Sequence, residues 1–228
     1  MKKSNILTGV LILLLVENVA AQDLPDPSFT LAKKSILSAS FQYQNLPDRW
    51  DINYYGLNLE IFLNEHISYS GSLVFGKGSD NLYYGHFPLA GAVLLLPAVL
   101  AMAGIEMMFP GFFENVDTAG DWAKAGLKIL LLENLNYNVR IGNKFMIVPY
   151  LNLLGAEGEV REAGKGSETS DVVILTTGAG INLRFFLTGR LTLNPNLNFK
   201  HFFTWGRASF GDGNYNGYAF GINLGYVF

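Results

Sequence analysis

The sequence predicts an all-β fold: an eight-stranded antiparallel transmembrane β-barrel with an apolar helical insertion in the second extracellular loop. Three observations predict it. Apolar and small polar side chains alternate along eight segments of the chain. The connections between these segments alternate between short and long. The chain also begins with a stretch of the secretory type.

The N-terminal stretch MKKSNILTGVLILLLVENVAAQ has the layout of a signal peptide. A basic start precedes an apolar core from Ile6 to Val16, and Ala21 supplies a small side chain before the expected cleavage point. The apolar core is shorter than the roughly 20 residues that a spanning helix needs. We therefore expect a cleaved signal peptide at 1–21 and a single exported barrel domain at 22–228.

Composition narrows the class of protein further. The chain has no cysteine and 3 histidines, so disulfides, a lipid-modified cysteine and a structural zinc site are not expected. A formal net charge of -3 with 15% charged residues provides no basic patch for nucleic acid. We expect no cofactor.

The alternation is clearest at the end of the chain. In NGYAFGINLGYVF, alternate residues such as Tyr218, Phe220 and Ile222 are large and apolar, whereas Ala219 and Gly221 between them are small. Similar segments make up the eight expected strands: 35–44, 53–63, 67–75, 132–141, 145–154, 172–187, 190–203 and 216–228.

The polar faces of these segments indicate a closed interior rather than a water-exposed surface. They are dominated by Asn, Ser, Gln, Thr and Gly, with few of the Lys and Glu residues of a solvated exterior. Uncharged polar groups can hydrogen-bond to one another inside a narrow barrel, while the apolar face meets lipid.

Connection lengths support this interpretation. Hairpin-sized turns are expected near 64–65, 142–143 and 188–189. Longer connections are expected at 45–50, 78–127, 155–171 and 205–216, the third of them as a solvated loop. In outer-membrane barrels the short turns are periplasmic and the long loops are external.

The C-terminus carries a resemblance to a known class. Tyr226 stands two residues before the terminal Phe228, as in the signal by which outer-membrane barrels are handed to the barrel assembly machinery. The mature chain resembles small eight-stranded outer-membrane barrels of the OmpA-transmembrane or OmpW-like kind. The resemblance implies the outer membrane of a Gram-negative bacterium, with outer-membrane lipids and the assembly machinery as partners. It implies an architecture and no particular activity.

The segment FPLAGAVLLLPAVLAMAGIEMMF, residues 87–109, interrupts the pattern. Its length alone makes it a candidate transmembrane helix. A spanning helix would exchange the sides of the short and long connections after it, and the order of connections shows no exchange. Gly91, Pro97 and Gly104 also weaken its tendency to insert.

We therefore expect a helical insert at about 87–126 in the second outer loop. It would comprise a helix over about 88–108 with a bend near Pro97, and a second short helix within 117–128. An apolar helix must pack on the barrel mouth, enter the lumen or contact lipid. A cap or plug, a lipid or hydrophobic-ligand contact and a true span remain the alternatives.

Four charged residues are expected to face the lumen. Glu60, Arg140 and Arg184 are predicted near the periplasmic ends of their strands, where an ion pair or small network would offset the cost of burial. Lys200 is predicted nearer the outer mouth, in a separate polar cluster.

The sequence favours a barrel that is not an enzyme, and two alternatives stay open. The first is binding or passage of small hydrophobic molecules or lipids, with Phe109, Phe112, Phe113 and Trp122 as candidate contacts. The second is a lipid-modifying enzyme, but the His-x-Ser-Asn signature of the outer-membrane lipid A deacylase is absent, because Phe203 stands two residues after His201.

Overall fold

The computed structural model describes residues 29–46, 50–79, 81–97, 107, 126, 128–160, 173–205 and 213–228. The predicted signal peptide at 1–21 lies outside the described residues, as do Phe109, Phe112, Phe113 and Trp122. No helix within the described ranges is both long enough and apolar enough to cross a membrane.

The described part of the chain is built almost entirely of strands. They are β1 (Ser35–Leu46), β2 (Trp50–Phe62), β3 (Ile67–Gly78), β4 (Tyr83–Pro88), β5 (Asn134–Tyr137), β6 (Val139–Ile141), β7 (Phe145–Val160), β8 (Val173–Phe186), β9 (Leu191–Trp205) and β10 (Gly213–Val227). The clearest predicted strands are present, and most are longer than expected.

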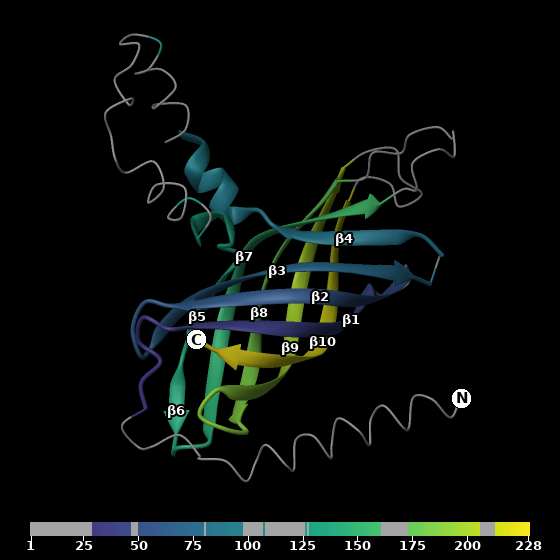
Figure 1. Ribbon diagram of the computed structural model, residues 1–228. Coiled ribbons are helices and arrows are strands. Elements are labelled where there is room, and N and C mark those ends of the chain that lie inside the picture. The colour runs from purple at the N-terminus through teal and green to yellow at the C-terminus, as the bar shows by residue number, and fades with distance from the viewer. Residues whose placement is uncertain are drawn as a thin grey trace, which may run out of the picture.

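The strands close into one antiparallel barrel (Figure 1). β1 pairs with β2 and β10, and the order continues through β9, β8, β7, β4 and β3 until β3 pairs with β2. β4 and the short strands β5 and β6 share one place in this order, beside β7. The described strands therefore fill eight positions, which confirms the predicted eight-stranded barrel.

The fourth position of the barrel is interrupted, and here the structure corrects the prediction. β4 and β5 both pair with β3 on one side and β7 on the other. The chain therefore leaves the wall part way along a strand position and returns at the same level, since Leu89 N still donates to Leu154 O and Glu133 N donates to Ser70 O. The predicted place of the insert in the second outer loop is wrong, because at that barrel end β3, which ends at Gly78, connects directly to its partner β4, which begins at Tyr83.

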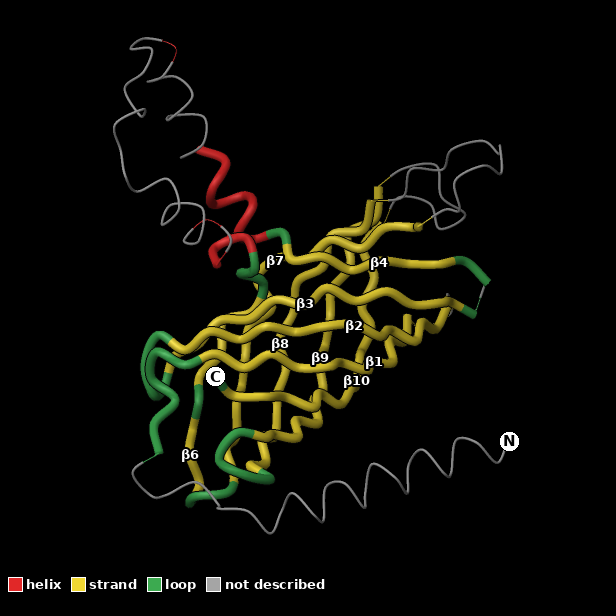
Figure 2. Tube along the Cα trace, in the orientation of Figure 1, coloured by secondary structure: helices red, strands yellow, loops and turns green. Residues whose placement is uncertain are grey.

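The sequence pattern does not predict the strand β4, whose sequence is YYGHFP. It is short, contains a glycine, ends in Pro88 and runs directly into the apolar stretch, so the sequence pattern places it in the long connection at 78–127 rather than in a strand. Residues 90–97 are helical, and this helix lies outside the strand wall (Figure 2). The predicted helix over 88–108 therefore begins after Pro88, and its remainder falls mainly outside the described residues.

Alternation along the strands gives the wall an apolar outer face. On β10 the outward side chains are exposed: Tyr218, Phe220, Ile222, Leu224 and Tyr226. The inward positions on the same strand include Ala219, Gly221 and Gly225, all buried. Ring contacts between outward side chains run across neighbouring strands, as between Phe41 and Tyr55 at a centroid distance of 5.1 Å.

Two apolar clusters fill the ends of the lumen, which the sequence pattern did not predict. Near the end with the longer connections lie Ile52, Tyr54, Val74, Tyr84, Ile174 and Phe202. Near the end with the short turns lie Leu31, Ile36, Phe62, Met146, Val148, Phe186 and Val227. We call these the outer plug and the inner plug. The polar part of the lumen lies between them.

Candidate functional site

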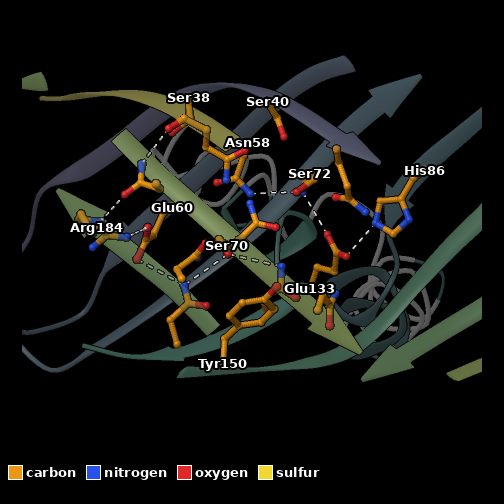
Figure 3. A pocket seen from close by; sticks show the side chains of 18 of the residues that line it. Ser38, Ser40, Asn58, Glu60, Ser70, Ser72, His86, Glu133, Tyr150 and Arg184 are labelled. Carbon is orange, nitrogen blue, oxygen red and sulfur yellow. Dashed lines mark hydrogen bonds and ion pairs between the residues drawn. The ribbon is translucent and has the colours of Figure 1, made fainter. Parts of the chain in front are cut away.

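The middle of the lumen holds a small polar cavity of about 50 Å³ (Figure 3). Eight asparagines and four serines line it, together with Gln42, Tyr150 and five charged or titratable side chains: Glu60, His86, Glu133, Arg184 and Lys200. This volume admits no more than a few water molecules. The interior is therefore packed with polar side chains rather than open.

At one end of the cavity lies the Glu60 cluster. Arg184 Nη2 donates to Glu60 Oε2, and Ser68 Oγ donates to Glu60 Oε1 at 2.5 Å. The other guanidinium nitrogens of Arg184 donate to Asn194 Oδ1 at 3.0 Å and to Asn138 Oδ1 at 3.1 Å. Every polar group of the Arg184 side chain thus has an acceptor, as a buried charge requires.

Arg140 belongs to a different contact. It lies half-buried in β6, and its Nη1 donates to the backbone oxygen of Phe29 at 2.8 Å. The structure therefore brings Glu60 and Arg184 together, while Arg140 holds the segment that precedes β1. This segment also contributes Leu31 to the inner plug.

At the other end of the cavity lies the His86 cluster, formed by His86, Glu133, Glu157 and Lys200. His86 Nε2 lies 2.7 Å from Glu133 Oε1, and His86 Nδ1 lies 3.3 Å from Glu157 Oε1. Lys200 Nζ is 3.2 Å from the same oxygen of Glu157. With His86 protonated, two carboxylates face two cations, and the charges balance.

Polar neighbours complete the His86 cluster. Gln44 links two of its members, because Lys200 Nζ donates to Gln44 Oε1 and Gln44 Nε2 donates to Glu157 Oε2, both at 2.8 Å. Tyr54 of the outer plug donates its hydroxyl to Glu157 Oε2 at 3.1 Å. Lys200 therefore lies in a separate cluster from Glu60, at the end of the cavity next to the outer plug.

The sequence pattern missed three members of this cluster: His86, Glu133 and Glu157. β7 carries a register shift between Asn152 and Gly155. Before the shift the even-numbered residues of β7 face the lumen. After the shift the odd-numbered residues do, so Glu157 faces inward. The prediction that a solvated loop begins at residue 155 is therefore wrong, since β7 continues to Val160.

Glu133 and His86 lie at the two ends of the insert. Glu133 directly precedes β5, while His86 lies three residues before the insert begins. Their ion pair inside the lumen therefore joins the two points at which the chain leaves and re-enters the wall. Asn152 Nδ2 also donates to Glu133 Oε1 at 2.8 Å.

Outside the wall, the two arms of the insert remain in contact at Gly91. Its backbone N–H donates to Leu132 O at 3.0 Å. A Cβ added to Gly91 would lie 1.7 Å from Ile129 O, so the arms approach too closely for any larger residue. The described side chains beyond this contact are largely apolar and exposed: Val93, Leu94, Leu96, Met107, Ile129 and Leu130.

The insert leaves the wall within its apolar outer face. The point of departure lies opposite residues 71–73 of β3, because Ser70 pairs with Asn134 and Val74 pairs with His86. At this level on β3 the outward side chain of Leu73 is apolar and exposed; beyond it Phe75 is also apolar and exposed, and Lys77 is the first charged outward residue.

Other candidate chemistry has little support in the described ranges. No group of three or more His, Cys, Asp or Glu side chains there has the arrangement of a metal site. His201 lies apart from the lumen clusters, with Nδ1 2.7 Å from Asn216 Oδ1 and its ring in a T-shaped contact with the Phe203 ring. These contacts suit an outward polar residue.

The polar core inside an apolar outer face defines the class of protein. A water-soluble barrel places apolar side chains inside, whereas the described wall presents them outside, and its sheet closes on itself through the pairing of β1 with β10. This is the arrangement of a small membrane-spanning β-barrel.

Comparisons with known proteins found similar solved structures. Three similar solved structures are the N-terminal β-barrel domain of Pseudomonas aeruginosa OprF (10% identity, TM-score 0.44), the outer-membrane protein OprG of the same organism (11%, 0.44) and Neisserial surface protein A (7%, 0.45). They cover 86%, 86% and 85% of this chain, and 98%, 96% and 94% of their own chains. At these values the matches carry no information on activity, ligand or partner. No protein-family model and no curated protein matches the chain.

Proposed function

We propose that the protein is an integral outer-membrane barrel, neither an enzyme nor an open pore, that holds its apolar insert in the membrane beside the barrel wall. The observation that carries this proposal is the place where the insert leaves the barrel. Its two arms depart between Pro88 and Asn134, opposite residues 71–73 of β3, where the outward side chain of Leu73 is apolar and exposed and is followed by the exposed Phe75. Exposed apolar side chains that leave the wall within its apolar outer face have a lower free energy in contact with lipid than in contact with water.

The filled lumen supports the same proposal. A solute passing along the barrel axis would have to displace the outer plug, then the two charge clusters, then the inner plug. Removing one partner of a buried ion pair costs about 3–5 kcal/mol, so spontaneous opening along this path is rare. Planar-bilayer recordings of the purified protein should therefore show no steady conductance, and a stable channel would overturn the sealed lumen.

The location of the insert has a direct test, because the chain contains no cysteine. A single Leu94→Cys variant, labelled with an environment-sensitive fluorophore in phospholipid vesicles, should be quenched by lipids brominated in their acyl chains and not by aqueous iodide. The matched control is Asn64→Cys in the exposed turn between β2 and β3, where the pattern should reverse. Quenching of the Leu94→Cys label by iodide would refute the proposed membrane position.

Export and assembly are part of the proposal. A cleaved signal peptide at 1–21 would deliver the chain to the periplasm, and the exposed side chains of Tyr226 and Phe228 are suited to recognition by the barrel assembly machinery. Phe228→Ala should lower the amount of folded protein in the outer membrane without changing the cleavage of the signal peptide.

A second candidate function is the binding of hydrophobic molecules or lipids. Phe109, Phe112, Phe113 and Trp122 remain its proposed contacts in the insert. A lipid-modifying activity would change the masses of lipid A or phospholipids when the protein is overproduced. We expect those masses to stay unchanged.

A further inference from the structure

The outer wall has an apolar groove of about 410 Å³ that the proposed function does not use. It lies across β3, β5, β7 and β8, on the short-turn side of the place where the insert departs. Its outward-facing lining includes Ile67, Leu135, Tyr137, Pro149, Leu151 and Ala179. All of these side chains come from the apolar outer face.

A gap in strand pairing produces the groove. β5 pairs with β7 as far as Asn136 and Tyr150, and pairing resumes only at Val139 and Ile147. Pro149 lies in this gap and has no N–H to donate to a neighbouring strand. The wall is therefore open on its outer surface beside Pro149.

Small residues on β8 deepen the groove. Ala179 pairs with Leu151 and presents only a methyl group to the outside. Next to it, Gly180 has no side chain, and the Tyr150 ring occupies the inward space, where an added Cβ would lie 2.4 Å from Tyr150 Cζ. Tyr150 thus blocks the way from the groove into the polar cavity.

We propose that this groove holds one alkyl chain of a membrane lipid. The proposal rests on the membrane position proposed above, since only then does hydrocarbon surround the groove. The groove is continuous with the apolar face that meets lipid, its volume lies in the range of about 300–1,000 Å³ typical of small-molecule sites, and its outward lining is apolar. The polar cavity behind Tyr150 excludes the chain from the lumen.

A matched pair of variants tests the site. Ala179→Phe fills the groove with a phenyl ring, whereas Ala39→Phe makes the same substitution on the outward face of β1, away from the groove. Both positions face outward and are exposed, so both variants are expected to fold, and the heat-dependent mobility shift of folded barrels verifies this. Ala179→Leu provides a smaller filling of the same site.

The measurement is photocrosslinking in phosphatidylcholine vesicles that contain a phosphatidylcholine with a diazirine on its acyl chain. Mass spectrometry of the digested protein should find adducts concentrated on Tyr137 and Leu151. We expect Ala179→Phe to lower their yield by at least about tenfold, Ala179→Leu by less, and Ala39→Phe not at all.

Each other outcome overturns the lipid assignment in a recognisable way. Adducts spread evenly over the outer face, or equal yields from Ala179→Phe and Ala39→Phe, would mean ordinary surrounding lipid. If the groove is protected from photocrosslinking and deletion of residues 98–127 removes this protection, the insert is the occupant. If the protection depends on protein concentration, a second copy of the chain is the occupant. In these cases the barrel is still in the membrane, whereas a protein that fails to enter vesicles would refute the proposed function itself.

Discussion

The two charge clusters in the lumen differ in how the chain builds them. The Glu60 cluster pairs side chains from β2 and β8, at positions where inward and outward residues alternate without interruption. The His86 cluster joins residues next to the insert with Glu157, which faces inward only because of the register shift in β7. Regular strands thus supply one cluster and irregular backbone supplies the other.

The clusters also differ in their cations. The Arg184 guanidinium is 1% exposed, so loss of its partner Glu60 would leave a buried charge without its counter-ion. His86 can lose its proton if a partner is removed. The Glu60 cluster should therefore be the more sensitive of the two to single substitutions.

The largest expected effect comes from Arg184→Met. It leaves the Glu60 carboxylate buried without its cation and should lower the free energy of unfolding by about 3–5 kcal/mol. Urea-induced unfolding in phospholipid vesicles, followed by tryptophan fluorescence, measures this change. The double variant Glu60→Leu with Arg184→Met should recover most of the loss, because an apolar pair leaves no unpaired charge. If the double variant were as unstable as the single one, the cost would arise from packing instead.

The sequence predicts the Glu60 cluster because its strands obey a two-residue period. Glu60 and Arg184 lie on the polar side of long alternating segments, and the same reasoning orients Lys200 inward. Long-range pairing around a closed barrel then leaves only a narrow lumen in which the opposite charges can meet. The same reasoning places Arg140 on the polar side, where the Phe29 carbonyl lies within its reach and accepts its hydrogen bond.

The His86 cluster could not be predicted by the same reasoning. One extra residue in β7 reverses the inward and outward positions beyond it, and no local feature of LNLLGAEGEV marks the reversal. β4 is too short to reveal its alternation, and the apolar stretch after it dominates the pattern. The sequence pattern therefore assigns the insert to the barrel end, although its two ends lie side by side within the wall.

Glu133→Gln should have a smaller effect than Arg184→Met. The amide keeps a hydrogen-bonding group near His86 Nε2, Glu157 remains beside His86 Nδ1 and Lys200, and His86 can lose its proton. We expect a loss of about 1–3 kcal/mol in the free energy of unfolding, measured in the same urea experiment. A loss equal to that of Arg184→Met would contradict the distinction between the clusters. Backbone hydrogen exchange should become faster near His86 and Glu133, at the two ends of the insert, while the strands around Glu60 stay protected from exchange.

The smallest effect on the barrel is expected from Gly91→Ala, which disturbs the contact between the two arms of the insert. In a helix, alanine is favoured over glycine by about 1 kcal/mol, so an unhindered site would gain stability. At Gly91 the added methyl group would meet Ile129 O at 1.7 Å and force the two arms of the insert apart. We expect faster hydrogen exchange over residues 90–97 and 128–132, with the unfolding free energy of the barrel changed by less than about 0.5 kcal/mol.

Gly126→Ala is the matched control for the Gly91→Ala variant, because a Cβ added at Gly126 meets nothing within 4 Å. It should leave exchange in the two arms unchanged or slightly slower. If Gly91→Ala destabilised the whole barrel, the arms of the insert would unfold cooperatively with the barrel. The insert would then not be an independent attachment to the wall. If instead only the arms loosen, the His86–Glu133 pair inside the lumen must hold the wall closed without help from the contact outside it.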